Sequence, residues 1–293
     1  MAQSELKLSL PATGAGFAPI HYAVDKGLFR DQGVEIQLVM LEGGPACASA
    51  LLAGQVEVTC ALGPLIRKAL REGARGFRGI SGLRNKIGFS IVGKPTLNSI
   101  HDLGGKSIES PNSDWSGGTY FKYVLRQLGV EGTIQAKFSY VTQEQRLQGL
   151  INGECDAGLL SAEKTLIAQE HGFKILVAFD KVIPEVCSSV IATTPGLIRD
   201  RREDLKKIIR AVRTGIQEIQ SSREVCVKYL MDRFGMSNEA AISLHKLQAP
   251  NWSTNLSLIS IQKEIDISHD VHGLPWISAA EIIDLTLLNE LSS

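Results

Sequence analysis

Two glycine-containing turns carry residue types and a spacing that could bind a small anion. Residues 42–47 read Glu-Gly-Gly-Pro-Ala-Cys, and residues 113–119 read Ser-Asp-Trp-Ser-Gly-Gly-Thr. Pro45 suits the first position of a helix, and Ser116 or Thr119 could cap a helix and contact a ligand oxygen. Because the first N–H groups of a helix have no acceptor within it, each turn could bind a carboxylate, sulfonate or phosphate. Trp115 would add a flat apolar wall.

Cys47 lies in the first turn of the helix that Pro45 opens, where the helix dipole lowers the pKa of a thiol. It could be a nucleophile, or a small apolar residue packed beneath the loop. A nucleophile needs a base within hydrogen-bond reach. His21 is the nearest candidate in sequence, but it lies in an apolar-periodic helix start. We therefore expect a packed thiol and no catalytic residue.

Other candidate positions come from loops next to predicted strands. Residues 11–17 follow the first strand, and their small residues would let backbone N–H groups approach a ligand, although a plain tight turn reads the same way. Glu185 precedes an apolar run and would favour an amine-bearing ligand if it faces a cleft; it could equally be a solvated loop acid. Residues 251–252 are expected at the cleft rim. The expected ligand-binding residues are Gly14, Gly16, Phe17, Gly43, Gly44, Pro45, Ala46, Leu62, Trp115, Ser116, Gly117, Thr119, Ser161 and Glu185.

Composition excludes several classes of function. Lys plus Arg and Asp plus Glu both number 31, so a zero net charge argues against nucleic acid or an anionic membrane as the main partner. No apolar run reaches transmembrane length, so no direct membrane insertion is expected. The five cysteines form no CxxC pair and the histidines show no ligand spacing, so neither a metal nor another cofactor is expected. The N-terminus lacks signal-peptide features, which suggests a cytoplasmic protein or one whose export signal has been removed.

A repeated pattern predicts how these turns are positioned. Residues 51–58 and 150–157 both read as the end of an amphipathic helix, a Gly stop and a short strand. Strand and helix patterns alternate around each copy, which favours parallel sheets covered by helices. We therefore predict an α/β protein with two lobes, and ligand sites occur preferentially between domains.

The expected domains are a discontinuous first lobe, residues 1–92 and 190–293, and a second lobe, residues 93–189. The apolar runs at 89–92 and 186–193 are expected to cross between them. From residue 199 onward the pattern is helical, including a final helix at about 278–291, and we expect these helices to form a layer on the first lobe.

Three segments, at 18–36, 51–59 and 101–108, give the chain a resemblance to a known family. The chain resembles solute-binding proteins of ABC transporters of the nitrate/sulfonate/taurine type, a group that also contains binders of thiamine-pyrimidine precursors. The resemblance implies a type II periplasmic-binding-protein fold, in which two α/β lobes are joined by two crossing strands with a ligand cleft between them. Pyrimidine synthases and a cysteine-dependent desulfinase share that fold, but the Cys-rich motif of the synthases is absent here.

The resemblance implies an extracytoplasmic protein, expected to be monomeric, that captures a small polar or anionic solute by hinge closure for an ABC transporter permease. The resemblance does not identify the ligand, which could be a sulfonate, a carboxylate, nitrate or a pyrimidine. The alternatives are a cleft enzyme of the same fold that uses Cys47, in the manner of a desulfinase or a pyrimidine synthase, and a cytoplasmic ligand sensor.

Overall fold

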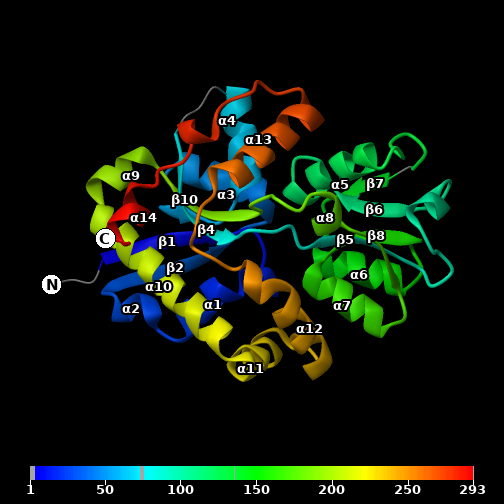
Figure 1. Ribbon diagram of the computed structural model, residues 1–293, viewed down its shortest axis with the longest axis horizontal. Coiled ribbons are helices and arrows are strands. Elements are labelled where there is room, and N and C mark those ends of the chain that lie inside the picture. Colours follow the sequence, from blue (N-terminus) through cyan, green and yellow to red (C-terminus); the bar gives the residue numbers. More distant parts are fainter. Residues whose placement is uncertain (1–3, 73–75, 135, 293) are drawn as a thin grey trace.

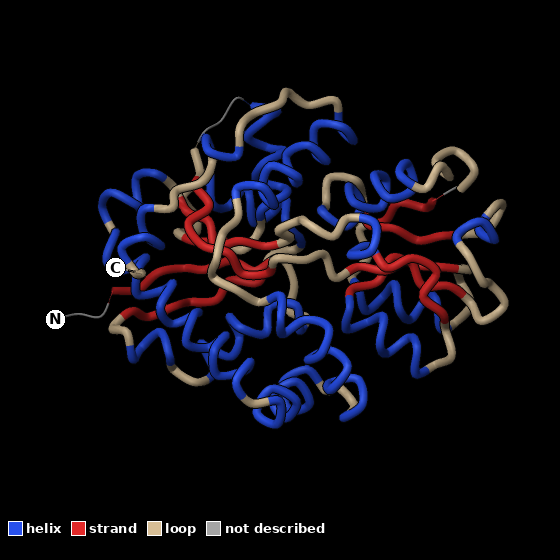
Figure 2. The backbone as a smooth tube through the Cα atoms, viewed as in Figure 1, coloured by secondary structure: helices blue, strands red, loops and turns tan. Residues whose placement is uncertain are grey.

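Two five-stranded sheets form the centres of two lobes that lie side by side (Figures 1 and 2). The computed structural model describes residues 4–72, 76–134 and 136–292. The first sheet has the order β2-β1-β3-β10-β4 and contains β1 (Ser4–Leu10), β2 (Val34–Met40), β3 (Val58–Thr59), β4 (Arg78–Arg84) and β10 (Ser189–Thr193). The second has the order β7-β6-β8-β5-β9 and contains β5 (Phe89–Gly93), β6 (Ile108–Pro111), β7 (Ala136–Ser139), β8 (Ala157–Ser161) and β9 (Lys174–Ala178).

Each sheet is parallel except for one strand. In the first sheet β10 is antiparallel to β3 and β4, and in the second β5 is antiparallel to β8 and β9. These two strands are the first that the chain forms after it changes lobe. The prediction of parallel sheets is therefore correct apart from the strands that enter from the other lobe.

The chain crosses between the sheets at 85–88 and again at 179–188 (Figure 1). The runs expected to cross, 89–92 and 186–193, lie largely inside the sheets, because β5 pairs with β8 and β9 while β10 pairs with β3 and β4. The expected boundary at residue 92 falls within β5, so by strand pairing the second lobe begins before that strand.

The helices between the strands follow the predicted alternation. The first lobe contains η1 (Ala15–Phe17), α1 (Ala18–Asp25), α2 (Leu28–Asp31), α3 (Gly43–Leu52) and α4 (Leu62–Glu72). The second contains η2 (Ile100–Leu103), α5 (Ser116–Gln127), α6 (Gln143–Ile151), α7 (Ala162–Glu170) and α8 (Phe179–Val182). The repeated pattern is confirmed: α3 and α6 are each followed by a glycine at positive φ, Gly54 at 69° and Gly153 at 78°, before the next strand.

The C-terminal helices cover more than the first lobe. They are α9 (Pro195–Asp200), α10 (Arg202–Ser221), α11 (Arg223–Phe234), α12 (Asn238–Gln248), η3 (Ala249–Asn251), α13 (Leu258–His272), η4 (Ala279–Glu281) and α14 (Thr286–Glu290). Helix α10 packs on α1 and α2, but α12 contacts α7, and α13 contacts both α4 and α5. Two of these helices therefore touch both lobes.

The final helix expected at 278–291 is instead two short helical turns, η4 and α14. Between them Ile283 forms a parallel bridge with Gly79 of β4. The N–H of Gly79 donates to Ile282 O at 2.8 Å, and the N–H of Asp284 donates to Gly79 O at 2.9 Å. Backbone pairing with the edge of the first sheet thus replaces a turn of helix.

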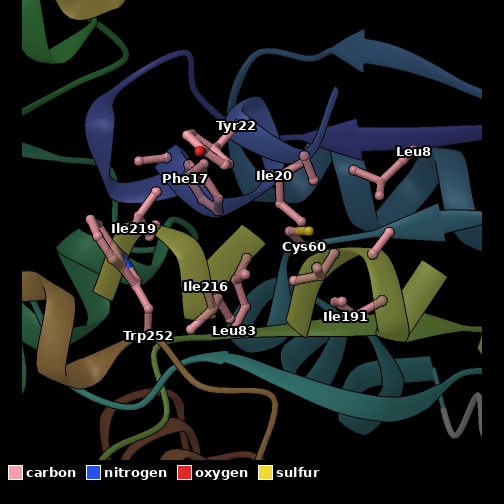
Figure 3. Packing of buried hydrophobic residues seen from close by; sticks show 14 of the residues in the cluster. Leu8, Phe17, Ile20, Tyr22, Cys60, Leu83, Ile191, Ile216, Ile219 and Trp252 are labelled. Atoms are coloured by element: carbon pink, nitrogen blue, oxygen red, sulfur yellow. The ribbon is translucent and has the colours of Figure 1, made fainter. Parts of the chain in front are cut away.

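One hydrophobic core of the first lobe lies between its sheet and the helices α1 and α10 (Figure 3), and a second core lies among α3, α4, α13 and β10. Leu8, Ile191 and Ile216 are buried in the first of these cores, and so is Trp252, whose exposed fraction is only 1%. The expectation that residues 251–252 reach the cleft rim is therefore wrong for the Trp252 side chain. Its backbone, however, forms an antiparallel bridge with Arg84 at the end of β4.

Candidate ligand-binding cleft

Three helix starts converge where the two lobes face each other. Helix α3 opens at Gly43, where φ is +81° and where an added Cβ would lie 2.8 Å from the indole ring of Trp115 at the start of α5. An added Cβ on Gly44 would lie 2.5 Å from Pro64 in the first turn of α4. Because Gly43 and Gly44 have no side chain, the start of α3 can lie against Trp115 and Pro64, which any Cβ atom would prevent. The first N–H groups of a helix have no acceptor within it, so these helix starts give the cleft a positive end, although the Gly43 N–H itself donates to Pro11 O and Leu41 O.

Arg84 is a cation that lies where the two lobes face each other. It ends β4, its Nε donates to Ser188 Oγ at 2.7 Å, and its guanidinium carbon lies 5.6 Å from the ring centre of Phe17. Within residues 4–72, 76–134 and 136–292 its guanidinium has no ion-pair partner. Burial lowers the pKa of Arg84, and Tyr120 and Cys187 oppose that shift. The side chain is nevertheless only partly buried, so an anion entering the cleft could reach it.

A second arginine is fully buried beside a glutamate. Arg67 of α4 places Nη1 3.6 Å from Oε1 of Glu264 on α13, and the two side chains are 2% and 0% exposed. Arg67 Nη2 also donates to the backbone O of Asp114 in the second lobe at 2.8 Å. Burial raises the pKa of Glu264 to about 7, an effect that Arg67 and then Tyr120 oppose. We call Arg67, Arg84, Tyr120 and Glu264 the cleft charge cluster.

Direct hydrogen bonds join the lobes on both sides of this cluster. On one side the N–H of Ala15 donates to Glu163 Oε2 at 2.6 Å. On the other side Arg71 of α4 donates to Asp114 Oδ1 at 2.8 Å, next to the bond from Arg67. The lobes are therefore in contact across the cleft in this structure.

The structure brings several of the predicted site residues to this interface. An added Cβ on Gly14 would lie 2.9 Å from Glu163 Oε2, and one on Gly16 would collide with the guanidinium of Arg84. The start of α3, residues 43–46, faces the second lobe through the Gly43–Trp115 contact. Ser116 Oγ lies 2.9 Å from the position of an added Cβ on Gly63, the neighbour of Leu62.

The remaining predicted site residues differ in their contacts and in their exposure. The Thr119 hydroxyl donates to Ser113 O at 2.7 Å and lies 3.1 Å from His272 Nε2, and Gly117 faces apolar side chains within the second lobe. Ser161 caps α7 through the N–H of Lys164. Leu62 is buried at the start of α4, whereas Pro45 and Ala46 stay partly exposed. Glu185 is exposed and lines a surface cavity of about 470 Å³ against α13, together with Ile259 and Lys263.

Arg67, Arg84 and Glu264 were missed from the sequence. The strand that ends in Arg84 was also missed, because Gly79 and Gly82 interrupt its apolar pattern. Those glycines were the available signal, since Gly within a strand marks the close approach of another backbone. An added Cβ on Gly82 would indeed collide with Asn255 O. Arg67 and Glu264 lie on amphipathic helices 197 positions apart, and no sequence pattern links them.

Cys47 is fully buried, and burial raises the pKa of its thiol while the Ser9 and Thr59 hydroxyls oppose that shift. His21 instead packs edge-on against Phe234 with its ring centre 5.6 Å away. The environment of Cys47 thus matches the packed thiol expected from the sequence. In the described part of the chain no group of three or more His, Cys, Asp or Glu side chains could hold a metal ion, and no helix there is both long and apolar enough for a membrane span.

The model of the family described as NMT1/THI5 like matches residues 15–224, which is more than half of the chain. The chain belongs to this family. No curated protein matches it by sequence.

Solved structures confirm the expected type II periplasmic-binding fold. The alkanesulfonate-binding protein SsuA from Xanthomonas axonopodis pv. citri, bound to MOPS, is 15% identical with a TM-score of 0.78, and the match covers 98% of this chain and 99% of that one. The periplasmic nitrate-binding protein NrtA from Synechocystis PCC 6803 is 14% identical with a TM-score of 0.76, covering 99% and 89%. The CA3427 gene product of Candida albicans, described as having the generic periplasmic binding protein fold, is 15% identical with a TM-score of 0.75, covering 96% of each chain. At these identities the likeness shows the fold.

Proposed function

We propose that this protein is an extracytoplasmic solute-binding protein that captures a small anionic solute between its lobes and delivers it to an ABC transporter permease. The family and the fold support binding between two lobes. The names of two structural neighbours, an alkanesulfonate-binding and a nitrate-binding protein, support an anionic solute.

The guanidinium of Arg84, which has no ion-pair partner among the residues that the structure describes, is the observation that carries this proposal. A partly buried cation without a carboxylate partner is costly in a low-dielectric site, and an anionic ligand would offset that cost. Arginine also binds carboxylate and oxyanion groups through two parallel N–H donors. The helix starts at Gly43 and Ser116 would add backbone N–H donors from both lobes.

Closure would follow from ligand contacts made by both lobes at once. Arg84 and the α3 start belong to the first lobe, and the α5 start belongs to the second. A ligand that touches both lobes binds the closed arrangement better than an open one, and it shifts the population toward closure by that difference in affinity. The bonds from Ala15 to Glu163 and from Arg71 to Asp114 would then form with it.

A thermal-shift screen against nitrate, alkanesulfonates, small carboxylates and pyrimidines tests the proposal, because a ligand that binds only the native state raises the melting temperature. We expect at least one anion to raise it in a concentration-dependent way. Arg84→Gln should abolish that shift. Arg199→Gln, at an exposed arginine paired with Asp200, should keep it. An absence of any shift in the wild type, or an equal shift in Arg84→Gln, would contradict the proposal.

A further inference from the structure

Glu264 is a buried acid at the junction of three helices, two of which belong to different lobes. It lies on α13, which packs against α4 of the first lobe and α5 of the second. Its Oε1 lies against Gly63 in the first turn of α4, where Ser116 Oγ and Arg67 Nη1 also converge. The carboxyl group thus occupies the positive end of α4, on the side that faces the second lobe.

Four buried side-chain atoms of this junction have no well-formed hydrogen bond within the described residues, although the Tyr120 hydroxyl lies close enough to Glu264 to lower the pKa of its carboxyl group. Both carboxyl oxygens of Glu264 and the Nε and Nη1 of Arg67 are buried without a well-formed bond in the described part of the chain. The 3.6 Å between Arg67 Nη1 and Glu264 Oε1 is too long for a hydrogen bond. Two donors and two acceptors therefore lie together without satisfying each other, at a place where buried polar groups are normally paired.

The charged and titratable groups around Glu264 can be named from each neighbouring element. Arg67 faces it from α4, Tyr120 from α5, and Cys187 from the segment before β10. On α13 itself the neighbouring Lys263 turns away and donates to Tyr123 Oη at 3.2 Å, and Asp266 accepts from Trp276. Arg67 is thus the one cation within ion-pair distance of Glu264 among the residues that the structure describes.

We propose that Glu264 couples the binding of an anion in the cleft to the uptake of one proton. This inference rests on the proposed function. An anion held by Arg84 and the start of α5, and within reach of Arg67, would lie beside the Glu264 carboxylate. Two negative charges in one buried site repel each other. A proton from solvent then bonds to one carboxylate oxygen, and no other bond changes. Protonation of Glu264 thereby removes one negative charge from the cleft when the anion binds.

The surroundings of Glu264 favour this proton uptake near neutral pH. Burial already raises the pKa of Glu264 to about 7 in the structure without a ligand. A further rise of about two pH units in this pKa, caused by the ligand's charge in a buried site, would keep the side chain neutral over the physiological range. His272, near Arg67 and Arg71, does not compete in this range, because burial and then Arg67 lower its pKa to about 4.

Isothermal titration calorimetry in buffers of different ionisation enthalpy measures the number of protons taken up. The probes are methanesulfonate, nitrate and acetate, which stay ionised from about pH 6 to about pH 8.5, so any proton uptake belongs to the protein. For the probe that binds, we expect about half a proton per ligand at about pH 7, because Glu264 is already partly protonated there, and an uptake approaching one proton at about pH 8 to 8.5. Above neutral pH the wild-type affinity should fall by up to about tenfold per pH unit.

Glu264→Gln should remove the proton uptake, make the affinity independent of pH and bind the probe more tightly than the wild type at about pH 8.5. His272→Gln is the matched control and should keep the proton uptake. Binding without proton uptake in the wild type, or weaker binding by Glu264→Gln at every pH, would overturn the inference while the proposed function stands. Failure of all probes to bind at any pH would overturn both.

Discussion

Burial controls the charge of individual side chains in this protein, and His21 is the clearest case outside the cleft. Its side chain is 2% exposed, and neither ring nitrogen has a hydrogen-bond partner among the residues that the structure describes. Burial, followed by the positive charge of Arg233, lowers the pKa of His21 to about 4. Its ring packs edge-on against Phe234, so the neutral form is part of the apolar packing of the first lobe.

His21 should make the protein lose stability in acid. In the unfolded chain His21 binds a proton near pH 6.5, but in the folded protein only near pH 4, so folding is weakened as the pH falls between these values. The loss should reach about 3 kcal/mol. His21→Phe should flatten the denaturant-measured stability between pH 6.5 and pH 4, and His171→Gln, at an exposed histidine, should not. An unchanged slope in His21→Phe would show that other groups cause the acid sensitivity.

Trp115 should contribute to ligand binding because its ring fills the space that Gly43 leaves open. Trp115→Ala is expected to weaken binding of the screened anion by ~1–3 kcal/mol, the scale of losing a well-packed aromatic contact. Trp276→Ala, at a tryptophan 58% exposed on the surface, is the control and should leave affinity unchanged. Calorimetry on both variants decides the matter, and equal affinity in wild type and Trp115→Ala would place the ligand away from the two helix starts.

At the scale of elements, α4 connects the lobes through its polar face. Arg67 and Arg71 lie four residues apart, so both project on one side of the helix, and both donate to Asp114 of the second lobe. The Arg71 and Asp114 side chains are about half exposed, at 45% and 49%. Exposed ion pairs stabilise folded proteins weakly, but this one forms only when the lobes are in contact.

Arg71→Gln should therefore change binding more clearly than folding. We expect the dissociation constant of the screened anion to rise by up to about fivefold, because an exposed ion pair of about 1 kcal/mol no longer favours the closed arrangement. The free energy of unfolding should change by less than about 0.5 kcal/mol. Lys68→Gln is the matched control, since Lys68 pairs within α4 with Glu72. Equal affinity in both variants would show that the Arg71–Asp114 pair plays no part in closure.

The sequence predicted the elements that have a regular pattern and missed those set by contacts between distant segments. The helix–Gly–strand repeat around Gly54 and Gly153 could be read because the glycine positions are local. Strand β4 was missed, because Gly79 and Gly82 interrupt its apolar pattern and the distant segments at 253–255 and 282–284 that contact these glycines cannot be read from the local sequence. The same holds for Arg67 and Glu264, whose proximity depends on how α13 crosses both lobes.

At the scale of the whole molecule, two lobes are joined by more than the two crossing segments. Helices α12 and α13 leave the first lobe's core and touch α7 and α5 of the second (Figure 1). Any opening of the cleft must therefore change the packing of these helices as well as the segments at 85–88 and 179–188. The two-lobe arrangement could be predicted from the sequence repeat. The contacts of α12 and α13 with both lobes could not, because helical periodicity shows which face of a helix is buried but not which element packs against that face.

Where the anion binds can be determined from a crystal structure of the protein with the anion that gives the largest thermal shift. We expect the anion between the lobes, within hydrogen-bond distance of the terminal nitrogens of Arg84 and of backbone N–H groups at the start of α3 or α5. An anion bound elsewhere, for example in the surface cavity beside Glu185, or one that Arg84 does not contact, would contradict binding between the lobes by Arg84.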